Sequence, residues 1–110
     1  MKDEKPQALA AEFSIGQIVH HKLFGYRGVI FDVDPVFAGS DAWYAQNSKT
    51  RSPRDKPWYH VLVHDTSSTT YVAERNLERD DSCDPVRHPL LDHVLERARG
   101  GNYRSRDRSN

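Results

Sequence analysis

The sequence has little cysteine, no long apolar run and no overall excess of either charge. Its single cysteine, Cys83, cannot form a disulfide within the chain. No run approaches the roughly 18 consecutive apolar residues that a transmembrane helix needs. Residues 1–12 mix lysine, aspartate and glutamate with one brief alanine-rich stretch, unlike a secretory signal. We therefore expect a cytoplasmic protein that is not inserted in a membrane.

Charge is balanced over the whole chain but not along it. Basic and acidic residues number 16 each. Between Arg97 and Asn110 five arginines accompany a single aspartate, which gives this tail a net charge of +4 and leaves −4 on residues 1–96. Affinity for nucleic acid comes largely from lysine and arginine that neutralise phosphates. The mildly acidic body is therefore poorly suited to bind DNA by charge alone.

The length of 110 residues allows one domain, and a content of 36% hydrophobic and 29% charged residues is that of an ordinary globular protein. Changes in composition and the positions of proline and glycine divide the chain into five parts. We expect a flexible N-terminal segment (1–12), a compact β domain (13–78), an acidic linker (79–88), an amphipathic helix (89–99) and a disordered Arg-rich tail (100–110).

Alternation of apolar and polar residues predicts strands over 17–21, 28–33, 58–64 and 69–73. Turn residues separate the first two and the last two, so we expect two hairpins, followed by a single turn over 74–77. The side chains predicted to fill the core of this domain are Ile18, Val29, Phe31, Tyr59, Val61, Val63, Tyr71 and Leu77.

A long insertion, residues 35–57, separates the two hairpins. Ser40 or Asp41 is placed to cap one or two helical turns over 42–46, which would bring Trp43 and Tyr44 against the β domain. A loop of this length in a small domain is usually functional or ordered by its own contacts.

The predicted helix over 89–99 begins at Pro89 and ends at the glycine pair 100–101. Its apolar side chains fall on one face. Three roles remain open for that face: packing on its own domain, pairing with a second copy of the chain, or binding in a partner's groove. The apolar residues are Leu90, Leu91, Val94, Leu95 and Ala98.

Metal and catalytic chemistry find little support in the spacing. On a strand, His60 and His64 lie about 13 Å apart, too far to share one zinc ion. Cys83 has no second cysteine near it. Asp32 and Asp34 share one strand face at about 7 Å, a pattern that suits a cation but is more often a solvated surface. We therefore predict no metal, no cofactor and no catalytic residue, and hence no enzyme.

Basic residues and aromatics gather in the insertion and in the tail, where they could contact nucleic acid or a protein partner. A single continuous basic face would favour DNA, whereas positive charge interrupted by acidic residues would favour proteins. The candidate binding residues are Lys49, Arg51, Arg54, Lys56, Trp58, His60, Arg97, Arg99, Arg104, Arg106 and Arg108.

The order of motifs resembles one known family. The run FSIGQIVHHKLFGYRGVIFDVDP over 13–35, the segment Pro57 to Val61, and the segment Thr70 to Glu74 with Leu77 are similar to the heat-shock protein Q family, also called the YccV-like or hemimethylated-DNA-binding domain family. The resemblance spans about residues 13–78 and includes the variable insertion. The Arg-rich tail departs from it, so no tail-borne degradation signal is carried over.

The resemblance implies an SH3-like small barrel of about five strands, here with a long insertion loop and a C-terminal α-helix. It also implies one of two non-enzymatic activities. The first is that of an adaptor, or specificity factor, for a Lon-type AAA+ protease that degrades denatured client proteins under heat stress. The alternative is a regulatory protein that binds hemimethylated duplex DNA. Assembly into a homo-oligomer is compatible with either.

Overall fold

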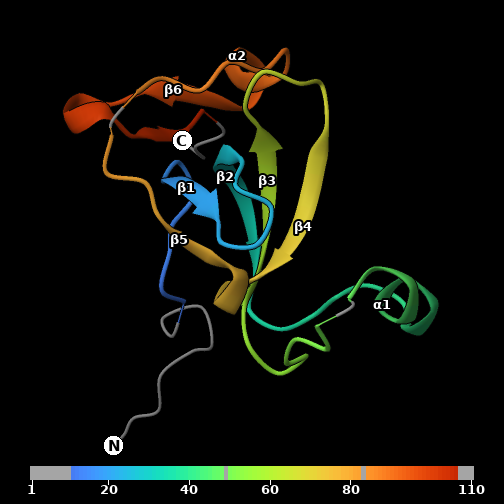
Figure 1. Ribbon diagram of the computed structural model, residues 1–110. Coiled ribbons are helices and arrows are strands. Elements are labelled where there is room, and N and C mark those ends of the chain that lie inside the picture. The colour runs from blue at the N-terminus through green and yellow to red at the C-terminus, as the bar shows by residue number, and fades with distance from the viewer. Residues whose placement is uncertain (1–10, 49, 83, 107–110) are drawn as a thin grey trace, which may run out of the picture.

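The computed structural model describes residues 11–48, 50–82 and 84–106 and is built mainly of strands (Figure 1). No helix in these ranges is long and apolar enough to cross a lipid bilayer. In chain order the elements are β1 (Ile18–His21), β2 (Arg27–Asp34), α1 (Asp41–Asn47), β3 (Trp58–Val63), β4 (Thr69–Ala73), the 3-10 turn η2 (Glu74–Asn76), β5 (Leu77–Arg79), α2 (Leu91–Val94), β6 (Leu95–Arg97), η3 (Arg99–Gly101) and β7 (Tyr103–Ser105).

Five strands form one antiparallel sheet in the order β4-β3-β2-β1-β5. Both predicted hairpins are present, β1 with β2 and β3 with β4, and the predicted turn after β4 is η2. The sheet does not close into the expected barrel. β5 has only three residues and pairs with β1, so β4 and β5 remain as the two edges of an open sheet.

The sheet is apolar on both faces, and each face carries its own core. A register shift between Ile30 and Asp32 marks a β-bulge in β2. The first core contains Phe13, Val19, Ile30, Tyr59, Val61, Val72 and Leu77. The second contains Ile18, Val29, Leu62, Val86, Leu95 and Tyr103. Of the eight predicted core residues six are buried, while Phe31 and Tyr71 are half-buried.

The structure differs from the helix predicted over 89–99. Only Leu91–Val94 is helical, and a hairpin of β6 and β7 follows it. Leu95 and Tyr103 are buried against the second face of the sheet, and this burial outweighs the local helical pattern. Gly100, at a φ of 83°, permits the intervening turn.

Parts of the predicted linker and tail therefore belong to the packed domain, since Val86 and Tyr103 are buried. Val86 lies fully inside the second core, and its backbone N–H donates to the Tyr103 hydroxyl at 3.1 Å. The chain is described as far as Arg106, and the last four residues of the predicted tail lie outside the described residues. At the other end, the predicted flexible segment is described only at residues 11 and 12, where the Glu12 N–H donates to the Glu74 carboxylate at 2.9 Å.

Gly16 joins the C-terminal hairpin to the sheet. Its φ is +92°, its carbonyl accepts a hydrogen bond from the Tyr103 N–H at 2.8 Å, and a Cβ placed on it would lie 1.8 Å from the Tyr103 carbonyl oxygen. Gly25 has a similar φ of +76°, but a Cβ there would meet nothing within 4 Å. A side chain at either position would be strained by the positive φ, and only at Gly16 would it also meet another part of the chain.

We predict that Gly25→Ala lowers the free energy of unfolding by about 1 kcal/mol, the cost of a left-handed alanine. Gly16→Ala has the same backbone cost and must also displace β7. We therefore expect it to lower the free energy of unfolding by about 3 kcal/mol in all. Urea denaturation of both variants beside the parent chain measures the difference. Equal losses would contradict the proposed role of the Gly16 contact in holding the hairpin.

Candidate functional site

A groove of about 540 Å³ runs along the outer edge of β4, and we call it the edge groove. All five residues of β4 line it. The turn between β1 and β2 forms one wall and the insertion forms the other, on opposite faces of β4. The principal wall residues are Leu23, Phe24 and Tyr26 from the turn, and Trp43, Asn47 and Thr50 from the insertion.

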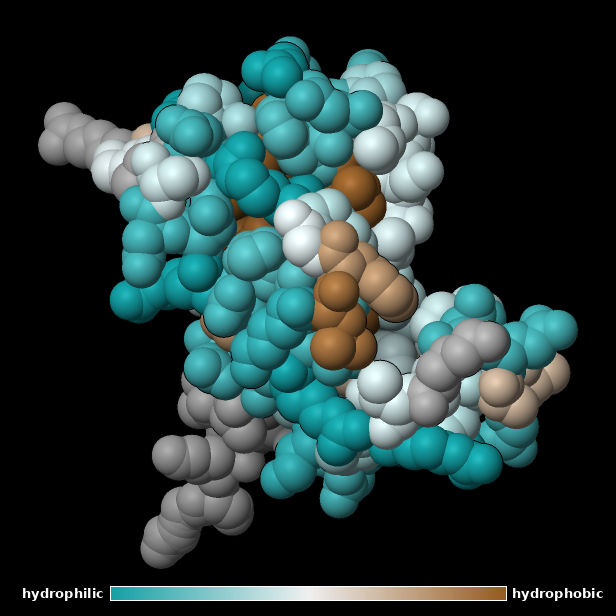
Figure 2. Space-filling view, in the orientation of Figure 1, coloured by the Kyte–Doolittle hydropathy of each residue, from teal (hydrophilic) through white to brown (hydrophobic). Residues whose placement is uncertain are grey.

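The turn wall presents two large apolar side chains to solvent. Leu23 is 57% exposed and Phe24 is 76% exposed. Apolar side chains gather at the centre of the face shown in Figure 2, over the turn between β1 and β2. The Tyr26 and Thr70 hydroxyls share a hydrogen bond of 2.8 Å, which ties this wall to β4.

His21 holds the turn in shape from beneath. Its side chain is buried, its Nδ1 accepts hydrogen bonds from the backbone N–H groups of Leu23 and Phe24, both at 3.1 Å, and its ring stacks on Phe24 at 4.6 Å. Burial lowers the pKa of His21, and the neighbouring His20 lowers it further. An acceptor at Nδ1 requires the neutral imidazole.

The insertion wall is backed by an aromatic cluster, of which Trp43, Trp58 and Tyr71 line the groove. The cluster consists of Phe37, Trp43, Tyr44, Trp58 and Tyr71. Ring centroids of Phe37 and Trp58 lie 4.9 Å apart, and those of Trp43 and Tyr71 lie 5.5 Å apart. The predicted helix in the insertion is confirmed as α1. Its cap is Ser40, whose Oγ accepts from the Trp43 N–H at 3.0 Å. This helix places Trp43 beside β4, as the sequence predicted.

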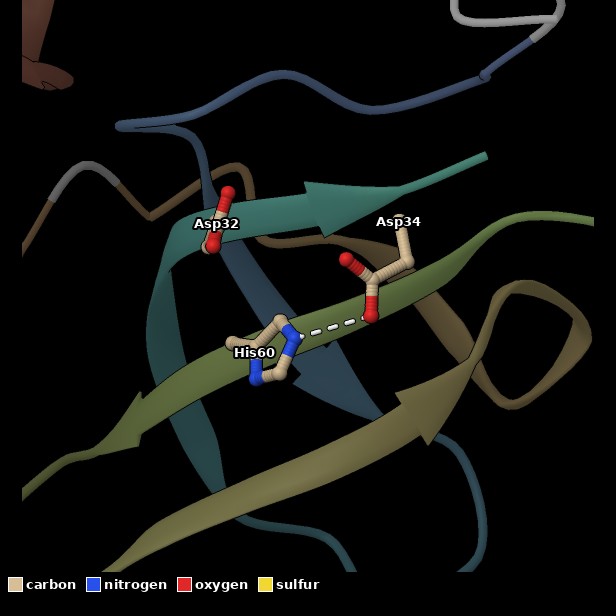
Figure 3. A group of neighbouring side chains, drawn as sticks. All are labelled: Asp32, Asp34 and His60. Carbon is tan, nitrogen blue, oxygen red and sulfur yellow. Dashed lines mark hydrogen bonds and ion pairs between the residues drawn. The ribbon is translucent and has the colours of Figure 1, made fainter. Parts of the chain in front are cut away.

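Asp32, Asp34 and His60 form a polar group on the face of the sheet beside the aromatic cluster (Figure 3). One ligand atom of each lies within 4.8 Å of the others, a geometry able to hold a divalent cation. The group has partners of its own, however. The Asp34 carboxylate contacts His60 Nε2 at 3.1 Å and accepts from the Tyr71 hydroxyl at 2.6 Å. Burial is the larger cause and the hydrogen bond to Asp34 the second, and together they raise the pKa of Tyr71 to about 12.

Among the described basic residues of the insertion, Arg54 is paired within the chain. Arg54 pairs with Asp41, and its guanidinium lies 4.8 Å from the ring centroid of Tyr44. Arg51 and Lys56 are exposed and have no ion pair within the described part of the chain. Lys49 lies outside the described residues. The predicted basic group of the insertion is thus partly neutralised, through the ion pair of Arg54 with Asp41.

The arginines of the tail are similarly occupied. Arg104 and Arg106 both contact the Glu96 carboxylate, at 2.7 Å and 3.3 Å. The Arg97 guanidinium lies over the Tyr103 ring. Arg108 and the Arg99 side chain fall outside what the structure describes. In Figure 1 the β6–β7 hairpin and α1 lie at opposite ends of the molecule, so the described arginines of the tail lie apart from those of the insertion.

Sequence reasoning named Trp58 and His60, which do line the edge groove, but missed Leu23, Phe24 and His21. The overlooked signal lies in the turn itself. Turns are dominated by glycine, proline, asparagine, aspartate and serine, whereas this one places leucine and phenylalanine side by side. Two large apolar residues side by side at a turn are the signal that could have marked this surface as a candidate interaction site.

Protonation of His21 should loosen the turn wall. Since its pKa when folded lies below the usual 6.5, the unfolded chain takes up the proton first as the pH falls. The His21 contribution to stability is therefore complete above about pH 6.5 and is lost as the pH falls toward the folded pKa. We predict that the parent chain loses more unfolding free energy between pH 7.5 and 5.5 than His21→Asn, which has no titrating group there. Parallel losses in the two proteins would contradict this.

A comparison with models of protein families matches residues 11–102 to the family described as hemimethylated DNA-binding protein, YccV-like. The match covers the sheet, the insertion, the turn that carries Leu23 and Phe24, and the C-terminal hairpin up to residue 102, which includes β6 but not β7. It confirms the resemblance inferred from the motif order and extends it beyond residue 78. The chain therefore belongs to the YccV-like hemimethylated DNA-binding protein family.

Proposed function

We propose that the protein is a non-enzymatic adaptor that binds denatured proteins in the edge groove and presents them to a Lon-type AAA+ protease. The observation that carries this proposal is the groove itself, with exposed apolar side chains on its turn wall and aromatic rings on the other. Denatured chains expose apolar side chains that folded proteins bury. An accessible apolar groove is the surface to which such segments bind.

Charge also supports a protein partner over DNA. A DNA-binding face needs lysine and arginine free to neutralise phosphates. Here Arg54, Arg104 and Arg106 are paired with carboxylates of the same chain. Exposed ion pairs contribute little to stability, but they reduce the field that would attract a phosphate backbone. The partner protease itself is proposed on the family resemblance alone.

The test is degradation of a chemically denatured, fluorescently labelled protein by purified Lon protease from the same cell, with and without this protein. We predict faster degradation with the parent chain. Leu23→Ser and Phe24→Ser should weaken capture of the denatured substrate about tenfold each, because a buried apolar side chain contributes about 1.5–3 kcal/mol.

Leu90→Ser is the matched control, since Leu90 is 45% exposed but does not line the edge groove. It should behave like the parent chain. A Leu90 variant as impaired as the Leu23 variant would show general apolar stickiness and would count against the groove. No effect of the parent chain on the protease would remove the adaptor role.

Binding of hemimethylated duplex DNA is the second candidate, and the description of the matching family favours it. The exposed residues able to contact phosphate are Arg51 and Lys56 of the insertion, for which no ion pair occurs within residues 11–48, 50–82 and 84–106. The aromatic cluster beside them offers rings on which an unstacked base can pack.

This candidate predicts tighter binding of a hemimethylated duplex than of fully methylated or unmethylated duplexes, at two salt concentrations. The double variant Arg51→Glu with Lys56→Glu should weaken all three and reduce the salt dependence by about two counterions. Fluorescence anisotropy measures both. Equal affinity for the three duplexes would reduce the interaction to charge attraction and exclude recognition of methylation.

A further inference from the structure

We propose that an extended segment of an unfolded polypeptide binds in the edge groove as an additional strand, hydrogen-bonded to the outer edge of β4. This inference rests on the proposed capture of denatured proteins and specifies how the segment is held. Strand addition recognises the backbone, which every protein has, and takes its selectivity from the side chains that flank the edge.

The hydrogen bonds that flank β4 determine which of its residues face outward. The Val63 N–H donates to the Ser68 carbonyl at 3.1 Å, and the Glu74 N–H donates to the Pro57 carbonyl at 3.1 Å. In an antiparallel pair, residues alternate between facing the partner strand and facing away. The register of β3 with β4 therefore directs the backbone groups of Thr70 and Val72 toward β3, and those of Thr69, Tyr71 and Ala73 outward.

The outward groups are most accessible at the start of the strand. Thr69 is exposed, Tyr71 is half-buried and Ala73 is buried at the inner end of the groove. No hydrogen bond from another described residue reaches the backbone of Thr69 or Tyr71 on that side. Each residue presents one donor and one acceptor, which is the pattern that an incoming strand requires.

The two edges of the sheet are protected differently. Sheet edges are usually blunted by charges, proline or very short strands. β5 follows this rule, because it has three residues, two of them the charged Glu78 and Arg79. β4 is five residues long, Thr-Thr-Tyr-Val-Ala, without charge or proline. The unprotected edge is therefore the one that lies in the groove.

The walls of the groove favour a single extended chain over a folded partner as its occupant. The turn wall stands on one face of β4 and the insertion wall on the other. A second copy that paired through its own β4 would bring the same two walls against them. A single extended chain has no such walls, and its side chains alternate between the two faces. They would contact Leu23 and Phe24 on one side and Trp43 and Tyr71 on the other.

The test uses Thr69→Pro in the full chain. Proline removes the outward N–H of Thr69, and at the first residue of an edge strand it leaves the ladder to β3 intact. Thr69→Ala keeps the N–H and is the matched control. The probe is a short fluorescein-labelled peptide that alternates leucine and serine, and its binding is measured by anisotropy. We expect Thr69→Pro to weaken binding at least tenfold, Thr69→Ala to change it less than twofold, and both variants to unfold at similar urea concentrations.

Amide hydrogen exchange gives a second measurement that does not depend on a variant. Adding the peptide to the parent chain should slow exchange at Thr69 and Tyr71, while Thr70 and Val72 are slow throughout. Peptide binding without this protection would overturn strand addition and leave capture of denatured proteins standing. Protection that rises with protein concentration in the absence of peptide would assign the edge to a second copy and also overturn the proposal. A peptide that binds as expected, in a protein without effect on the protease, would refute only the adaptor role.

Discussion

The central constraint on this fold is that β3 is apolar on both faces. Tyr59 and Val61 point into one core while Trp58 and Leu62 point to the other side, and all four are buried. A five-stranded sheet cannot cover both of its own faces, so other parts of the chain must cover the second one. The C-terminal hairpin does so near Leu62, and the insertion does so near Trp58. Between these two covers the sheet is left partly open at His60 and β4, and the edge groove lies there.

Features that depend on neighbouring residues could be predicted from the sequence. Period-two alternation located four of the five strands of the sheet within one residue or so, and Ser40 before an aromatic helix located α1. The C-terminal region could not be predicted in this way. Residues 89–99 have a sound helical pattern, but Leu95 reaches the second core only as part of a strand. Tyr103, eight residues further along, is buried in the same core and lies in the strand that pairs with β6, outside the helical pattern.

The candidate site could be predicted only in part, because much of it also depends on contacts between residues far apart in the sequence. Trp58 and His60 were named because they lie in the segment Pro57 to Val61, which resembles the family. The grouping of His60 with Asp32 and Asp34 depends on the β-bulge after Ile30, which fixes which β2 residues lie opposite β3. The sequence named the tail arginines as candidates but could not predict their ion pairs, because Glu96 faces Arg104 and Arg106 only when β6 and β7 pair. Contacts across strands are set by register, and register is a property of the folded chain.

An unprotected strand edge is a hazard for any protein, because it invites association with other sheets. The structure limits this hazard by position and not by charge. β4 lies between a turn on one face and an aromatic loop on the other, and His21 holds that turn through the backbone N–H groups of Leu23 and Phe24. Access is thereby limited to chains thin enough to enter between the walls. Unfolded segments have that shape and folded sheets do not, so under the proposed strand addition this geometry would favour a denatured client over a second folded copy.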